Sequence, residues 1–366
     1  MKLNFFVIIA VFLSLISCSD NINKNNLVDK NATERTSIMF EKLLSMCGKK
    51  TMFGHQDTGV YGHSGWMYIE GKSDIKDVCG LAPAVYGWEL GHLELGEEVS
   101  LDSVSFNEIR KGIQYADSKG SINTISWHLR NPWNGNSAWD KSAGTIQQIL
   151  TDSVVEQRFM SYLDRLADFL LSLKDERGEF IPVLLRPLHE HTGSWFWWGR
   201  DFCTPEEYKQ LWRKMVSYLK DVKEVHNVLY IYSPDKVLSK QDYLDRYPGD
   251  EWVDIWGLDL YHRDGESKAK EYMDTASMIL SFMSEECVQR KKPFVFSETG
   301  LSTLNMNNWF TEVLYPIISK THPAYVLLWR NAYNMPDHFY APYPGHSSTD
   351  DFNRFVQKQD IVMQGE

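Results

Sequence analysis

The sequence predicts an α/β protein built on a single (β/α)8 barrel. Eight short apolar runs alternate with longer amphipathic ones, and most of the short runs are apolar nearly throughout, as parallel strands covered on both faces are. An open, doubly wound sheet is the competing architecture. No GxGxxG or phosphate-loop motif follows the first run, so the nucleotide-binding forms of that sheet lose their main support. Eight strands and their helices in one uninterrupted series favour the barrel.

The expected strands follow one another in chain order. They are "TMFGHQ" near 51, "PAVYGW" near 83, "INTISWH" near 122, "IPVLLRP" near 181, "VLYIYSP" near 228, "DIWGLDLYH" near 254, "PFVFSETG" near 293 and "AYVLLWRN" near 324. Two of the helices between them are clear, "SVVEQRFMSYLDRLADFLLSLK" and "TPEEYKQLWRKMVSYLKDV". In the second, Thr204 is placed as N-cap, Pro205 at the first helical position and Glu207 to close a capping box.

The N-terminus reads as a targeting segment outside the fold. After Lys2 comes an apolar run too short to span a bilayer, so residues 1–17 are expected to be a signal peptide. Its end, "LISC", resembles a bacterial lipobox, which implies cleavage before Cys18 and lipidation of that cysteine. The polar stretch 18–35 predicts a tether, and residues 36–366 one catalytic domain. The protein is therefore expected to be an exported, membrane-anchored lipoprotein.

Composition excludes some partners and favours others. The chain has 366 residues and a net charge of −11, with no cluster of Lys or Arg, so a nucleic-acid partner is not expected. Its 13 Trp and 18 Tyr supply many flat faces that suit sugars, although most such rings fill cores. Cys47, Cys79, Cys203 and Cys287 lack metal-type spacing, and their disulfide pairing stays open.

The stretch "RPLHEHTGSWFWWG" at 186–199 predicts the lining of a cleft. Unpaired charges are costly to bury, and four aromatic residues in a row are unusual on a surface that binds nothing. Polar residues also end the other expected strands, which in a barrel brings them to one mouth. These strand-end residues are His55, Gln56, Trp88, Glu89, Trp127, His128, Arg186, Asp259, Tyr261, Glu298, Trp329 and Arg330.

Glu190 and Glu298 follow or end the fourth and seventh strands, so they are expected to face each other across the mouth. Two opposed carboxylates in an aromatic cleft suit glycoside hydrolysis, in which one donates a proton and the other attacks or activates water. Glu190, among aromatic rings, is the expected acid/base. Glu298 would need hydrogen-bond donors, which His189 or Tyr261 could supply.

Supporting roles are expected for charged neighbours of this pair. Arg186 is placed to orient a carboxylate, and Asp259 to orient His189 or His128, although burial as a plain ion pair explains either one equally well. His128, His189 and His191 allow a metal site on paper, a reading we do not favour because "HExxH" is absent. Trp195 and Trp329 are expected to stack under a sugar ring, or else to pack the barrel rim.

Together these motifs resemble glycoside hydrolase family 26. The resemblance rests on "RPLHEHTGSWFWWG" and "FSETG", and extends to "FGHQD", "SWHLRNPWNG", "DLYH" and "WRNA", covering roughly residues 36 to 355. The family implies a (β/α)8 barrel and retaining β-mannanase activity, with Glu190 as acid/base and Glu298 as nucleophile. It implies that His189 and Tyr261 bond the nucleophile or the sugar. It further implies that substrate is bound by His128, Trp195, Trp329 and Arg330.

The expected activity is hydrolysis of β-1,4-mannosidic bonds in mannan, galactomannan or glucomannan by double displacement. No metal or organic cofactor is expected, and the chain is expected to act as a monomer on β-mannan or manno-oligosaccharides. Two alternatives stay open: a member that releases mannobiose from a chain end, and one that acts on another β-glycan. The stretches 61–77 and 129–149 are long enough to wall off one end of a cleft. A binding protein without catalysis explains too little, since both carboxylates are present.

Overall fold

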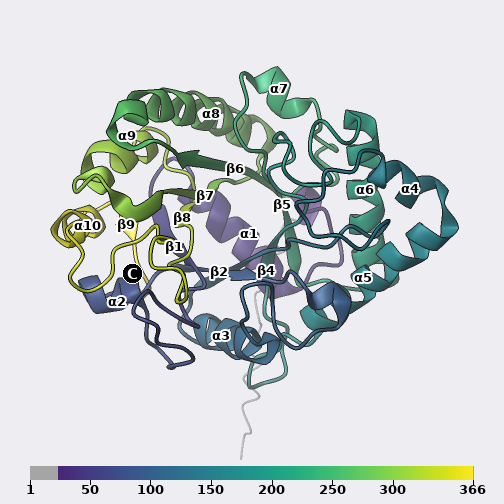
Figure 1. Ribbon diagram of the computed structural model, residues 1–366, viewed down its shortest axis with the longest axis horizontal. Coiled ribbons are helices and arrows are strands. Elements are labelled where there is room, and N and C mark those ends of the chain that lie inside the picture. The colour runs from purple at the N-terminus through teal and green to yellow at the C-terminus, as the bar shows by residue number, and fades with distance from the viewer. Residues whose placement is uncertain (1–23, 366) are drawn as a thin grey trace, which may run out of the picture.

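The computed structural model describes residues 24–365 as a closed barrel of eight parallel strands (Figure 1). Each strand pairs with the next along the chain, and the eighth pairs with the first, which closes the ring. The strands are β1 (Thr51–Gln56), β2 (Val85–Glu89), β3 (Ile122–Ser126), β4 (Val183–Arg186), β5 (Val228–Tyr232), β6 (Ile255–His262), β7 (Phe294–Leu301) and β8 (Tyr325–Leu328). Every expected run contains one of them apart from at most one residue at its end, so the predicted fold class is confirmed.

Helices surround the ring of strands (Figure 1). The α-helices are α1 (Glu34–Met46), α2 (Asp74–Cys79), α3 (Phe106–Ser118), α4 (Thr145–Thr151), α5 (Ser153–Leu171), α6 (Pro205–Ser217), α7 (Lys240–Leu244), α8 (Ala269–Arg290), α9 (Tyr315–Ile318) and α10 (Thr349–Val356). Shorter helical turns are η1 (Lys24–Asn26), η2 (Leu93–Leu95), η3 (Tyr218–Val222), η4 (Gly265–Lys268), η5 (Ser302–Leu304) and η6 (Phe310–Leu314). The capping box expected at α6 is present: Thr204 and Glu207 each bond the other's backbone N–H.

The strands are apolar throughout because both of their faces are buried. In β4, Leu184 packs inside the barrel, whereas Val183 and Leu185 pack outward in the layer beneath the helices. The interior cluster also includes Phe40 and Leu43 of α1. This helix therefore covers the end of the barrel where strands begin, and Figure 1 shows it behind the ring. The predicted site residues lie at the opposite end of the barrel, where the strands finish.

The predicted tether at 18–35 is wrong over the residues that the structure describes. Leu27, Val28 and Ala32 are buried, and α1 already begins at Glu34. The polar groups between them find partners: the Val28 N–H donates to Asp254 at 2.8 Å, and Asp29 lies 2.7 Å from His226. These few apolar side chains are enough to hold the segment against the barrel, because its polar groups form hydrogen bonds there. The chain from residue 24 onward belongs to the barrel.

The C-terminal end adds a short strand that the sequence did not predict. β9 (Ile361–Val362) pairs in parallel with the start of β1, so the last residues also fasten to the barrel. Within residues 24–365, every helix is too short or too polar to span a bilayer. Cys47, Cys79, Cys203 and Cys287 are free thiols. The predicted signal peptide and Cys18 lie outside the described residues.

Candidate active site

Glu190 and Glu298 meet at the open end of the barrel. Glu298 belongs to β7, and Glu190 lies in the turn that follows β4. Leu188 and Glu190 in that turn have φ angles of 49° and 52°, a strained conformation for residues other than glycine. The Glu190 N–H donates to the Ser233 carbonyl at 2.8 Å, which holds the turn against β5. One oxygen of each catalytic candidate and one of Asp259 all lie within 4.8 Å of one another.

Glu298 is held by charged and polar donors. Its Oε2 accepts from the Arg186 guanidinium at 2.5 Å, and its Oε1 accepts from the Tyr261 hydroxyl. The same guanidinium pairs with Asp259 at 2.6 Å. Burial, and then the charge of Glu298, raises the pKa of Tyr261, so this hydroxyl stays a donor. Arg186 and Tyr261 thus occupy the predicted positions, whereas the contacts of His189 lie elsewhere.

Glu190 has the opposite surroundings. It is buried, and its Oε2 accepts a hydrogen bond from the Trp195 indole at 2.6 Å. Burial, and next the negative charge of Glu298, raises the pKa of Glu190 well above its ordinary value. Only Trp195 among these neighbours favours the ionised form. Glu190 therefore holds a proton more readily than an ordinary carboxyl, as an acid catalyst must.

Two histidines form a wall beside the acidic pair. His128 Nδ1 lies 2.8 Å from Glu89, and its Nε2 lies 3.2 Å from His189 Nε2. Burial lowers the pKa of His128, but the Glu89 carboxylate outweighs burial and raises it. Burial, and then the charge of His128, lowers the pKa of His189, so this ring is the neutral acceptor. Asp259 orients neither ring; because it pairs with Arg186, the expectation that it orients a histidine is wrong.

Aromatic residues after Glu190 divide between the site and the core. Trp195 is half-buried and reaches Glu190, whereas Phe196, Trp197 and Trp198 are buried. The Trp198 indole donates to the His189 carbonyl at 2.8 Å and so supports the wall from behind. Trp329 follows β8 at the same end of the barrel, and its ring centroid lies 6.3 Å from that of His128.

Arg330 is fixed at the rim beyond Trp329. Its guanidinium pairs with Asp102 at 2.8 Å and bonds the Tyr61 hydroxyl at 3.2 Å. Tyr61, Asp102 and Arg330 come from the loops after β1, β2 and β8, so these three loops converge there. A contact between Arg330 and substrate remains a prediction.

A family model for glycosyl hydrolase family 26 matches residues 28–298, a span that includes both carboxylates. The chain belongs to glycosyl hydrolase family 26. A Bifidobacterium adolescentis protein named mannan endo-1,4-beta-mannosidase is 33% identical over 365 residues, which cover 94% of this chain and 36% of that protein. A Bacillus subtilis protein of the same name is 32% identical over 270 residues, covering 70% of this chain and 69% of the relative.

Solved family 26 structures have the same barrel. A GH26 beta-mannanase from Bacteroides ovatus has a TM-score of 0.88 and 40% identity, with 91% of this chain and 96% of that chain covered. GH26C from a Muricauda species has a TM-score of 0.85 and 29% identity, with 94% and 95% covered. Fold and family membership therefore agree with the resemblance that the sequence motifs carry.

Two contacts at this family 26 site could not be predicted from the sequence. Glu89 was noted only as a strand end, yet it fixes His128 and accepts from Ser126 at 2.6 Å. Burial raises the pKa of Glu89, but the charge and hydrogen bonds of His128 outweigh burial and lower this pKa to about 2. Trp139 stacks on the His128 ring with centroids 5.1 Å apart and remains 48% exposed at the mouth. Its place next to His128 depends on loop geometry that spacing does not reveal.

The three-histidine metal reading is not supported by the geometry. The turn after β4 is not extended, so His191 points away from His189 and packs against Tyr208 and Tyr232, with centroids 4.4 and 4.7 Å away. Among residues 24–365, the one group of side chains that could hold a metal ion is Glu190, Asp259 and Glu298. Arg186 already pairs with two of these three carboxylates.

Proposed function

We propose that this family 26 chain is a retaining endo-β-1,4-mannanase. The observation that carries the proposal is the carboxylate pair: Glu190 and Glu298 approach within 4.8 Å, each in a different electrostatic setting. Retaining glycosidases keep their carboxyl groups about 5–5.5 Å apart, and inverting ones about 6.5–9.5 Å to admit a water. The names of the Bifidobacterium and Bacillus relatives support mannan as substrate, although the chain spans only 36% of the Bifidobacterium protein.

In the first step, Glu190 gives its proton to the glycosidic oxygen while Glu298 attacks the anomeric carbon. The bond to the leaving sugar breaks, and an ester between Glu298 and the retained sugar forms. In the second step, Glu190 takes a proton from water, whose oxygen displaces Glu298 and regenerates both carboxyls. Arg186 and Tyr261 orient the attacking carboxylate and stabilise it when it leaves. Configuration at the anomeric carbon is retained.

The test is a time course of products from linear β-1,4-mannan and mannohexaose, with Glu190→Ala and Glu298→Ala as controls. A spread of oligosaccharides that both substitutions abolish supports an endo-mannanase and its catalytic pair. NMR of the first product must show the β anomer; an α anomer would exclude Glu298 as nucleophile. Absence of mannan hydrolysis by the wild type would favour another β-glycan, as in the endoglucanase H of Acetivibrio thermocellus, 24% identical over 62% of this chain.

A second candidate mode is release of mannobiose from a chain end. The convergence of three loops at Arg330 favours it, and so does the stack of His63 on Tyr343, with centroids 3.8 Å apart, which joins the loop after β1 to the loop after β8. A wall at that end of the cleft would stop the chain after two sugars. Mannobiose alone from the first time point would support this mode.

We further propose an exported lipoprotein that acts as a monomer. Support for the anchor is the "LISC" motif ending at Cys18. Metabolic labelling with a fatty acid tests it, since Cys18→Ala should abolish both label and membrane recovery. Support for the monomer is that one chain supplies every residue of the proposed site. Light scattering of the soluble domain at micromolar concentration tests it.

A further inference from the structure

A buried carboxylate outside the proposed catalytic pair joins two loops at the mouth of the barrel. Asp74, the first residue of α2, is only 1% exposed. Its Oδ2 accepts from the His63 N–H at 2.8 Å, and its Oδ1 accepts from the Trp66 indole at 3.0 Å. The packing is so close that a Cβ on Gly62 would come within 2.2 Å of Asp74 Oδ1. These contacts fasten the loop after β1 to the start of α2.

The same carboxylate reaches the loop after β8 through Asn331. The Asn331 amide donates to Asp74 Oδ2 at 2.9 Å. Its side-chain oxygen accepts from the backbone N–H groups of Tyr340 and Ala341, at 3.1 and 3.0 Å. Asn331 is buried and directly follows Arg330 in the chain. Asp74 therefore fixes the backbone next to Arg330.

His63 joins the same two loops a second time. Its Nε2 lies 3.0 Å from the Pro336 carbonyl oxygen, and its ring stacks on Tyr343 with centroids 3.8 Å apart. Because Asp74 binds the backbone N–H of His63, both contacts depend on where Asp74 holds this residue. The loops after β1 and β8 therefore form one unit with Asp74 at its centre.

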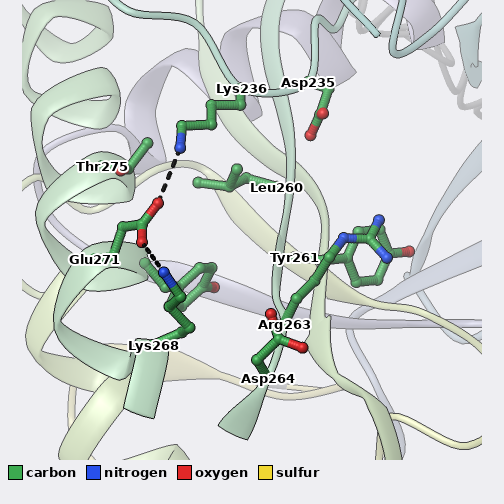
Figure 2. A pocket seen from close by; sticks show the side chains of 10 residues that line it. Asp235, Lys236, Leu260, Tyr261, Arg263, Asp264, Lys268, Glu271 and Thr275 are labelled. Atoms are coloured by element: carbon green, nitrogen blue, oxygen red, sulfur yellow. Dashed lines mark hydrogen bonds and ion pairs between the residues drawn. The ribbon is translucent and has the colours of Figure 1, made fainter. Parts of the chain in front are cut away.

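The opposite half of the mouth is fastened by exposed ion pairs (Figure 2). There Glu271 of α8 lies 3.1 Å from Lys236, in the loop after β5, and 2.9 Å from Lys268. All three side chains are exposed, and such pairs contribute little to stability. Asp74 accepts from neutral donors instead. Burial, opposed by the charge of Asp74, lowers the pKa of the neighbouring His55 to about 4, so this ring supplies no cation at neutral pH.

Burying a carboxylate among neutral donors costs free energy, and hydrogen bonds offset this cost only in part. We propose that Asp74 is a positioning residue for substrate binding, which fixes Trp329 and Arg330 at the mouth through the loop that carries them. Asp74 itself is buried and does not touch the substrate. This inference rests on the proposed function, because it takes the mouth as the place where mannan binds.

The experiment measures kcat and KM on mannohexaose for wild type, Asp74→Ala, Asp74→Asn and Asn331→Ala. Asp74→Ala should raise KM about 10-fold, because hydrogen bonds to a charged group are lost and the loops separate. Its kcat should stay within about threefold of wild type, since the contacts of Glu190 and Glu298 are unchanged. Asp74→Asn keeps an oxygen that can accept from both His63 and Asn331, so its KM should stay within about threefold of wild type.

Asn331→Ala should raise KM as much as Asp74→Ala, and the double variant should show no further rise, because the two residues act as one unit. Asp254→Asn is the matched control. Asp254 is also a buried carboxylate that accepts backbone N–H groups, from Val28 at 2.8 Å and Tyr230 at 2.9 Å, but it lies at the covered end of the barrel. This control should lower the urea midpoint of unfolding and leave KM unchanged.

An unchanged KM in Asp74→Ala would overturn the proposal. So would an equal rise of KM in Asp254→Asn, because lost stability alone would then weaken binding. A rise in Asp74→Asn as large as that in Asp74→Ala would also overturn it, since the charge and not the hydrogen-bond geometry would then matter. If Asp74→Ala does not fold, Asn331→Ala tests the same link. A wild type that does not hydrolyse mannohexaose would instead defeat the proposed function, so the two failures are distinguishable.

Discussion

At the scale of single residues, the two carboxyls that we propose as catalytic differ by their neighbours alone. Glu298 has a guanidinium and a hydroxyl on its oxygens, whereas Glu190 has one indole N–H and lies near two other carboxylates. The first set stabilises a charge and the second opposes one. Sequence reasoning predicted the acid role of Glu190 because aromatic residues follow it directly, and the nucleophile role of Glu298 came from the family resemblance. It missed Glu89, whose partner His128 is distant in sequence and becomes a neighbour only when β2 and β3 pair.

The indole of Trp195 makes a specific contribution to the pH profile. Its hydrogen bond favours the ionised form of Glu190, so Trp195→Phe should raise the pKa of Glu190 further. Because the acid must be protonated, the alkaline limb of kcat/KM should move to higher pH by about 0.5–1 unit. A pH series on mannohexaose measures this, with the exposed Trp133→Phe as control. A limb that stays in place or moves to lower pH contradicts the role of the bond.

Arg186 is the residue on which the buried charges most depend. Arg186→Met leaves Asp259 and Glu298 without their cation, so the free energy of unfolding should fall by about 3–5 kcal/mol. Thermal or urea unfolding measures the loss. Adding Asp259→Asn should restore part of the stability and no activity, because Glu298 still lacks its partner. Arg200→Ala removes an exposed ion pair and should cost less than about 1 kcal/mol.

At the scale of elements, apolar runs located all eight strands because burial on both faces leaves a continuous signal. The α6 capping box was equally predictable from the sequence, since it depends on residues that are close together in the chain. Three features could not be predicted from the sequence. They are the strained turn at Glu190, the two-residue β9 and the packing of residues 24–33. Each depends on partners that lie far away in sequence, such as Ser233, β1 and Asp254.

The loop after β3 is an element held by one carboxylate. Asp140 accepts from Asn131 at 2.6 Å, Asn134 at 2.9 Å and Asn136 at 3.2 Å, and this loop presents Trp139 to His128. Asp140→Ala should free the loop and raise KM for mannan by about 3- to 10-fold, while kcat changes little, because the proposed catalytic pair is untouched.

Hydrogen exchange of residues 131–142 checks the cause of that change. Protection of these amides should fall in Asp140→Ala and stay unchanged elsewhere in the barrel. The exposed Asp274→Ala, which removes an ion pair on α8, is the matched control. A fall in kcat with KM unchanged would show that the loop acts on chemistry rather than on binding.

At the scale of the whole molecule, the two ends of the barrel have separate tasks. The end where strands finish holds the site, and the end where they begin is covered by α1 and by residues 24–33. Interactions at the covered end stabilise the barrel without touching substrate. Stability and activity should therefore respond separately to changes at the two ends.

The N-terminal segment provides the test of this separation. A chain that begins at Lys24 keeps every described contact, whereas one that begins at Thr33 loses buried Leu27 and Val28 and leaves the buried Asp254 without the Val28 N–H. The second should lose about 2–5 kcal/mol of unfolding free energy, from lost apolar burial and the lost bond. At low temperature its kcat/KM should equal that of the longer chain, since no site residue changes. Urea unfolding and mannohexaose kinetics measure the two quantities, and equal stability of both chains would restore the tether as first predicted.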